Sequence, residues 1–340
     1  MGSFSLLTRR ISPQPIAVHF GSDVIRFMQI KGFAEHSIHD AIEVANNDHV
    51  GILDALSSFR GKRCVVCLSP KDALVQHVRT DINDDSQLLD KLVRHDERWK
   101  HAEIRSVCIK TTGPGINAQQ ELLCVGVNRA FAQNVVRKLE TAGAQVIAVT
   151  VPLYASIRAF DKLHRRDGDD KITSMLIDMD ELVSMVMISH GSNCVFAHRV
   201  ESCTSEVSET WGVELEVEPA LLPLSTAKSA ETERREETNP RGLCSVRENV
   251  ASGEKKFVVE LERCLRHHDT LFPERTIDRV IFTGCGAIDT ERCAAIATEL
   301  GIVSFIADPS AWIKGATKIA SGPSWTTAAG LCLRYSEGAA

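Results

Sequence analysis

The feature that most constrains the fold of this chain is a hairpin pattern that occurs twice. Residues 15–30, PIAVHFGSDVIRFMQI, contain two apolar runs joined by Gly21-Ser22-Asp23. Runs rich in β-branched and aromatic residues around such a turn predict a β-hairpin. Residues 173–200 repeat the pattern, with an apolar run that ends near Asp178, a tight turn and further apolar runs. We therefore expect an internal duplication with one such hairpin in each half.

Strands and helices are expected to alternate along the rest of the chain. Apolar residues at helical spacing (Ile42, Val44, Val50, Leu53 and Leu56) predict a helix across HDAIEVANNDHVGILDALSSF. Residues 64–149 predict a compact α/β unit, with a hairpin at the GPG turn of residues 113–115. The polar, charged residues at about 226–253 predict a mobile loop, followed by a helix, a strand and the glycine-rich turn GCGA.

Composition excludes several classes of function. The chain of 340 residues has a net charge of -6, which offers no general attraction to nucleic acid. No apolar stretch approaches the ~20 residues of a membrane helix, so a soluble chain is expected. The eleven cysteines lie mostly in apolar segments, as expected for reduced core thiols. Cys64 and Cys67 form one CxxC without a second ligand pair, and His267-His268 diverge on a helix, so no metal site is expected.

In order and spacing, five segments resemble the PilM family of actin-like proteins of type IV pilus assembly, and beyond it FtsA and actin. These segments are the opening hairpin, residues 64–149, KLETAGAQVIAVTVPLYASIRAF, LIDMDELVSMVMISHGSNCVFAHRV and VELERCLRHHDTLFPERTIDRVIFTGCGA. The resemblance implies an α/β, actin-like (ribonuclease H-like, duplicated) fold with an inserted subdomain of the FtsA/PilM type. It assigns residues 12–60 and 149–172 to the first half, 61–148 to the inserted 1C-like subdomain and 173–335 to the second half, with the mobile loop at about 226–253.

The resemblance also implies a nucleotide site, of which this chain keeps only a part. The matching positions are Gly21, Ser22, Arg26 (where the family usually has lysine), Asp178, Gly284 and Gly286. However, His19 replaces the usual aspartate of the first loop, and a neutral imidazole is a poor partner for Mg²⁺. Asp180 replaces a glycine of the second loop, where a further carboxylate repels a triphosphate. Gly284 and Gly286 fit either an adenosine site or a plain turn from strand to helix.

Two hypotheses follow. The first is a non-enzymatic scaffold of a type IV pilus or related secretion machine, without catalytic residues or cofactor. The resemblance implies that it binds the cytoplasmic tail of a PilN-like membrane protein as an extended peptide, in a groove around Cys64 to Val78 beside the inserted subdomain. We also expect it to contact other components of the machine and to self-associate, but not to bind nucleic acid. The expected location is cytoplasmic, at the inner face of the membrane, where partners would hold the protein.

The alternative hypothesis is a switch of the same assembly that binds ATP and Mg²⁺ and hydrolyses ATP slowly or not at all. A small-molecule kinase of the same superfamily is a third, less supported reading.

Overall fold

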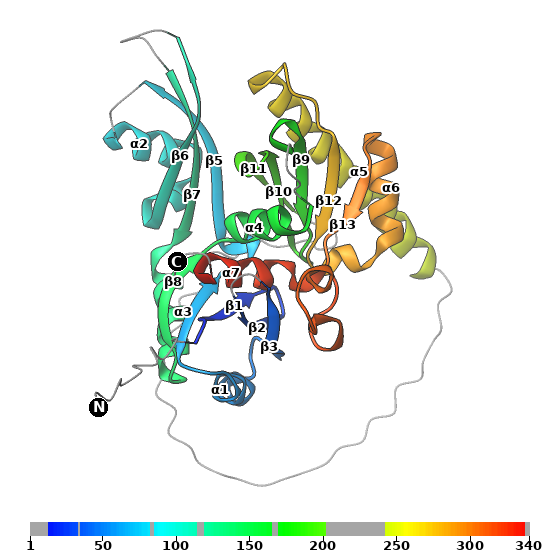
Figure 1. The fold of residues 1–340 in the computed structure, drawn as a ribbon. Coiled ribbons are helices and arrows are strands. Elements are labelled where there is room, and N and C mark those ends of the chain that lie inside the picture. The colour runs from blue at the N-terminus through cyan, green and yellow to red at the C-terminus, as the bar shows by residue number, and fades with distance from the viewer. Residues whose placement is uncertain are drawn as a thin grey trace, which may run out of the picture.

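The computed structural model describes residues 13–32, 35–81, 85–113, 119–164, 169–201 and 242–336. In these residues the strands form two five-stranded sheets and one three-stranded sheet. Figure 1 shows the two larger sheets on either side of helices α4 and α7, with the three-stranded sheet (cyan) beside them. The repeated hairpin thus predicts the architecture correctly, because each larger sheet is built around one copy of it.

The first sheet has the strand order β3-β2-β1-β4-β8. Its strands are β1 (Ile16–Phe20), β2 (Val24–Lys31), β3 (Ser37–Ala45), β4 (Arg63–Cys67) and β8 (Gln145–Thr150). The first three strands pair antiparallel, whereas β4 and β8 run parallel to β1. The opening hairpin therefore forms as expected, with its turn at Gly21-Ser22-Asp23.

Alternation of side chains along these strands builds a core on each face of the sheet. Ile16 and Val18 pack with α1 (His49–Ser58) and α3 (Arg129–Thr141). Ala17, on the opposite face, packs with α7 (Thr326–Ser336). Cys64 and Cys67 belong to different cores, as their spacing on a strand predicts, so the CxxC does not bring two thiols together.

The second sheet repeats the first with the order β11-β10-β9-β12-β13. Its strands are β9 (Thr173–Asp178), β10 (Val183–His190), β11 (Asn193–Glu201), β12 (Arg279–Thr283) and β13 (Ser304–Ile306). Again the first three strands are antiparallel and the last two run parallel to the first. The helices α5 (Gly242–Leu271) and α6 (Thr290–Leu300) pack on one face.

The two halves are held together by helices that exchange sheets. Helix α4 (Pro152–His164) follows the first sheet in the chain but packs on the second, and α7 follows the second sheet but packs on the first. The two helices lie against each other at Gly330, where an added Cβ atom would stand 1.9 Å from the carbonyl oxygen of Ala155. This close approach requires glycine at position 330.

The three-stranded sheet is the inserted unit, with the order β5-β7-β6. Its elements are β5 (Ala73–Asp81), α2 (Asp85–His95), β6 (Ala102–Thr112) and β7 (Gln119–Asn128), packed around Trp99. The unit also contacts the second half, because Arg199 of β11 donates from Nη1 to the carbonyl of Ala73 at 3.0 Å. The amide of Ala197 donates to Nε2 of His77 at 3.3 Å.

One helix prediction is wrong over its first part. Residues Ser37–Ala45 form β3, and the helix begins only at His49, with the carboxylate of Asp48 accepting from the amide of Gly51 at 2.8 Å. The misleading signal is the apolar pair Ile42 and Val44. These residues are two apart, which is the spacing of one strand face, and β3 pairs with β2 along its length.

Two predicted boundaries also differ from the structure. Strands β4 and β8 lie at the ends of the expected 61–148 segment, yet they pair within the first sheet because their apolar side chains complete its two cores. Of the loop expected at about 226–253, residues 242–253 are the start of α5, because the helical pattern continues N-terminal to Glu254. Residues 226–241 lie outside the described residues, as do Pro114 and Gly115 of the expected GPG turn.

Among the described residues, no helix combines the length and the apolar character needed to cross a lipid bilayer.

Candidate functional site

The turns of the two repeated hairpins face each other between the two halves. In the first turn, the amide of Gly21 donates to the carbonyl of Val24 at 2.8 Å, and the side-chain amide of Asn46 donates to the carbonyl of Ser22 at 2.8 Å. The amide of Asn46 donates to the carbonyl of Asp23 at 2.8 Å. These bonds tie the turn to the end of β3 and use the Gly21 amide inside the hairpin.

Asp180, from the second turn, connects the two halves. Its Oδ2 atom accepts hydrogen bonds from Ser22 at 2.8 Å and from Ser69 at 3.2 Å, and both serines are buried residues of the first half. Its Oδ1 atom accepts from the backbone amide of Glu181 at 3.0 Å and from the thiol of Cys285 at 3.3 Å. The carboxylate of Asp180 therefore accepts hydrogen bonds from the donor groups that surround the two turns.

Asp178 ends β9, just before the second turn, and is almost fully buried. Its Oδ2 atom accepts from Ser156 of α4 at 3.2 Å and from Thr327 of α7 at 3.1 Å. Burial, and secondly the charge of Asp180, raise the pKa of Asp178 to about 6. Asp72 has a similar environment, in which burial raises its pKa to about 6 and Asp180 adds to the effect. Asp72, Asp178 and Asp180 therefore lie close enough together to influence one another.

His19 and Arg26 face each other across the first hairpin. Both are buried, and Arg26 forms an ion pair with Glu43 of β3, with 2.7 Å between Nε and Oε2. Burial lowers the pKa of His19 to about 4, and the charge of Arg26 acts in the same direction. His19 is therefore a neutral imidazole at physiological pH, and the charge of Arg26 is already balanced.

The glycines at positions 284 and 286 are packed against the second turn. Gly284 has a φ of 84°, and a Cβ atom there would stand 2.4 Å from the carbonyl oxygen of Met179. At Gly286 an added Cβ atom would stand 2.8 Å from the Cβ atom of Met179. The backbone amide of Gly286 also donates to the carbonyl oxygen of Met179 at 2.8 Å. Packing is a sufficient reason for both glycines, which favours the plain turn over the adenosine site.

The six residues expected from the sequence thus gather around the two turns, although none was predicted to make the contacts found there. Sequence reasoning marked Asp180 as a lost glycine and did not predict its role in joining the halves. It missed Ser69, Ser156 and Thr327, which supply hydroxyl donors to the two aspartates. Serine and threonine are too common for any signal to mark these three.

A separate cavity of about 560 Å³ lies between the inserted sheet and the first half. It lies between β6 and β7 on one side and α3, β8 and the start of α4 on the other. Its lining is mostly apolar, with arginine and glutamate side chains at the margin: Glu103, Arg105, Val125, Gly126, Val127, Arg129, Ala132, Gln133, Val136, Arg137, Glu140, Val149, Thr150, Val151 and Tyr154. The lining includes no residue of the expected Cys64 to Val78 segment. The reason is that β7 separates β5 from this side of the inserted sheet.

Comparison with known proteins identifies the fold. A solved structure of the PilM–PilN type IV pilus biogenesis complex superposes with a TM-score of 0.69 and 12% identity, over 96% of this chain and 100% of the matched chain. The chain has a PilM-like, actin-type fold. No protein-family model and no curated protein sequence matches it.

Two further solved structures give lower scores than the PilM–PilN complex. The cytoplasmic domain of EpsL, an inner membrane component of the type II secretion system of Vibrio cholerae, has 16% identity and a TM-score of 0.38, over 72% of this chain and 95% of that one. A Bacteroides thetaiotaomicron protein with an actin-like ATPase fold and unknown function has 8% identity and a TM-score of 0.46, over 87% and 91%. The PilM-like assignment rests on the first superposition.

Proposed function

We propose that the chain is a non-enzymatic, actin-like scaffold of a type IV pilus or related secretion machine, and that it binds the cytoplasmic tail of a membrane partner. The observation that carries the proposal is the superposition over the whole matched chain of the PilM–PilN complex. The partner in this proposal is PilN-like, and the protein would be held at the inner face of the cytoplasmic membrane through it.

The contacts of Asp180 support a role without nucleotide hydrolysis. A triphosphate needs backbone amides, hydroxyls and a cation that are free to face it. Here Ser22 and Ser69 donate to Asp180, the Gly21 amide bonds within its own hairpin and Arg26 pairs with Glu43. The neighbouring acids Asp72, Asp178 and Asp180 would in addition repel the phosphates. The residues present therefore do not fit ATP, and no catalytic step is assigned to them.

The cavity beside the inserted sheet suits an extended peptide. It lies next to β8 and β6, which are edge strands of their sheets, so within the described part of the chain their outer backbone groups have no neighbouring strand. A peptide can add to such an edge and place alternate side chains in an apolar pocket. Arg105 and Arg129, which both lie within 3.7 Å of Glu103, flank the pocket with charge.

A binding titration tests the scaffold hypothesis. The ligand is a peptide from the N-terminal cytoplasmic tail of a PilN-like membrane protein. Val136→Asp introduces a charge into the lining and should weaken binding by at least about tenfold, since a desolvated charge costs more than 1.4 kcal/mol. Val50→Asp, at a residue of α1 that is 67% exposed, is the control and should bind as the native chain does. Absence of binding by all plausible tails would contradict the proposal.

Calorimetry with ATP and Mg²⁺ separates the scaffold from the switch. The native chain should give no heat of binding, and the double variant His19→Asp, Asp180→Gly should gain affinity because it restores an acid and a glycine to the two turns. Measurable binding of ATP by the native chain would favour the switch instead.

A further inference from the structure

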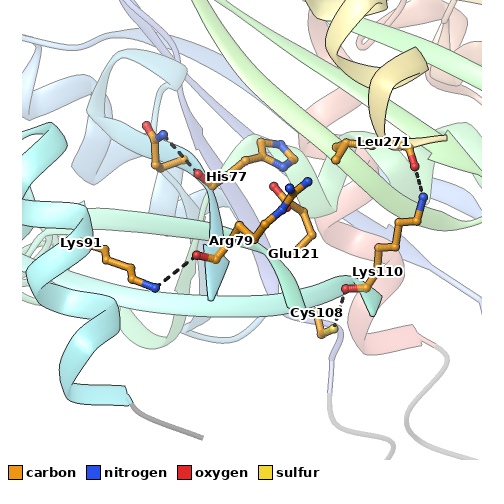
Figure 2. A network of polar contacts seen from close by, with 8 residues as sticks. His77, Arg79, Lys91, Cys108, Lys110, Glu121 and Leu271 are labelled. Atoms are coloured by element: carbon orange, nitrogen blue, oxygen red, sulfur yellow. Dashed lines mark hydrogen bonds and ion pairs between the residues drawn. The ribbon is translucent and has the colours of Figure 1, made fainter. Parts of the chain in front are cut away.

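A cluster of histidine and glutamate side chains lies where the inserted sheet meets the second half. His77 is on β5, Glu121 is on the neighbouring β7 and His267 is near the end of α5. One ligand atom of each lies within 4.8 Å of the other two. Figure 2 shows His77 and Glu121 on the same side of the inserted sheet, together with Arg79. Three residues from distant parts of the sequence thus offer two imidazoles and one carboxylate at one point.

The ring of His77 has one nitrogen without a partner. The ring stacks on Phe196 at 4.8 Å between centroids, and its Nε2 atom accepts from the amide of Ala197. Its Nδ1 atom is buried and has no hydrogen-bond partner among the described residues. Because a neutral imidazole carries one proton, the bond at Nε2 leaves that proton on Nδ1, where nothing accepts it. A metal ion at Nδ1 would require this proton to move to Nε2, so the ring would give up the long 3.3 Å contact with Ala197 in exchange for a metal–nitrogen bond.

The donor set indicates the class of metal. Imidazole and carboxylate ligands suit zinc and related divalent ions, which bind them at about 2.0–2.2 Å. Tetrahedral ligands at that distance lie roughly 3.4 Å apart, so the three side chains must each shift by about 1 Å. His267 is exposed and Glu121 has a flexible side chain, so such a shift needs no change of the backbone.

We propose that His77, Glu121 and His267 form a zinc-type divalent metal site that ties the inserted sheet to the second half. The site adds to another contact between these units, the hydrogen bond from Lys110 of β6 to the carbonyl of Leu271, which Figure 2 also shows. His267 and its neighbour His268 point to different clusters, since Nε2 of His268 lies 3.0 Å from Nε2 of His190. Their divergence on the helix therefore leaves His267 available to this site.

Arg79 is the internal competitor for Glu121. Its Nε atom lies 3.2 Å from Oε2 of Glu121, and the two residues are cross-strand neighbours. The side chain of Arg79 is 62% exposed, so it can turn into solvent when a metal takes the carboxylate. Removal of this arginine should therefore strengthen metal binding, which no merely structural role of the cluster predicts.

The test is a titration of the full chain, freed of metal and of any histidine tag, with Co²⁺. Visible absorbance reports a four-coordinate site, and Zn²⁺ should displace the signal. One Co²⁺ should bind per chain, Glu121→Gln and His267→Asn should each weaken binding by at least about tenfold, and Arg79→Gln should strengthen it. His101→Asn, at an exposed histidine outside the cluster, is the control and should leave binding unchanged.

Three results would overturn the proposal. They are the absence of saturable Co²⁺ binding by the native chain, unchanged binding in both the Glu121→Gln and the His267→Asn variants, and weakening by His190→Asn in their place. The exposed His267 and the paired Glu121 can be replaced with little risk to folding, and thermal unfolding of each variant verifies this.

Discussion

The hydroxyl of Ser22 donates a 2.8 Å hydrogen bond to the carboxylate of Asp180, across 158 residues of sequence. Ser22 belongs to the first hairpin and Asp180 to its repeat, so this bond joins equivalent turns of the two halves. Ser69 donates to the same oxygen. The two hydroxyls therefore couple the halves through one carboxylate.

Loss of either serine hydroxyl should destabilise the chain. Ser22→Ala and Ser69→Ala should each lower the free energy of unfolding by about 1–2 kcal/mol, because each removes a hydrogen bond to a charged, part-buried group. Ser57→Ala, whose exposed hydroxyl bonds within its own helix, should change it by less than about 0.5 kcal/mol. Urea unfolding measures all three. If Ser22→Ala lowers the free energy of unfolding by the same amount in the Asp180→Ala variant as in the native chain, then the hydrogen bond between Ser22 and Asp180 does not stabilise the contact of the two halves.

Alanine at position 284 should be more harmful than alanine at another glycine of positive φ. Gly284 and Gly143 have φ values of 84° and 85°, but only Gly284 has atoms within 4 Å of an added Cβ atom. Gly143→Ala should cost about 1–2 kcal/mol for the left-handed backbone. Gly284→Ala should cost at least about 1 kcal/mol more because of the contact with Met179. Equal losses in urea unfolding would show that this contact relaxes without cost.

Gly330→Ala should reverse the usual effect of this substitution in a helix. An alanine for a glycine inside a helix ordinarily stabilises by about 1 kcal/mol. Here the new Cβ atom would meet the carbonyl of Ala155 at 1.9 Å, so α4 and α7 must move apart. We expect a loss of about 2 kcal/mol or more in thermal unfolding. A stabilised variant would contradict the close packing of these two helices.

The buried Asp178 should give the stability a measurable pH dependence. Its folded-state pKa of about 6 lies above the ordinary value of 3.8, so the folded state binds this proton more tightly than the unfolded chain. The contribution of Asp178 to stability is therefore largest below pH ~4 and is lost as the pH rises to ~6. The free energy of unfolding of the native chain, minus that of Asp178→Asn, should grow by on the order of 2 kcal/mol from pH 7 to pH 4.

The subtraction isolates Asp178 from the histidines. His19 and His77 have folded-state pKa values lowered to about 4, so their contribution is present above pH ~6.5 and is lost as the pH falls toward 4. This opposite trend is common to both proteins and cancels in the difference. A difference that stays constant between pH 7 and pH 4 would show that Asp178 titrates normally.

The sequence predicted the parts of the fold that depend on local pattern. The hairpin around Gly21 and its repeat after Asp178 were found because a turn between two apolar runs is a short-range signal. The strand that contains Ile42 and Val44 was mistaken for a helix because both periods fit a short apolar run. The pairing of β4 with β1 and of β8 with β4, which places both strands in the first half, depends on long-range contacts that no local pattern records.

The sequence indicated which residues lie near one another but not how they interact. The structure brings Ser22, Asp178 and Gly284 together around the two turns, whereas the nucleotide-binding role that the resemblance implies for them stays a prediction. That Asp180 would accept from Ser22 and Ser69 depends on where the two halves meet, and this is set by α4 and α7 far from either turn. The cluster of His77, Glu121 and His267 likewise joins three elements that carry no shared motif.

The hydrogen bonds from Ala197 and Arg199 to the inserted sheet have a consequence for aggregation. β11 is the last strand on its side of the second sheet, and such a strand readily pairs with another molecule. The amide of Ala197 is capped by His77, and Arg199 fastens β11 to Ala73 at the start of β5. The inserted unit therefore shields a strand that would otherwise recruit further copies, and a chain from which residues 73–128 are deleted should self-associate through β11.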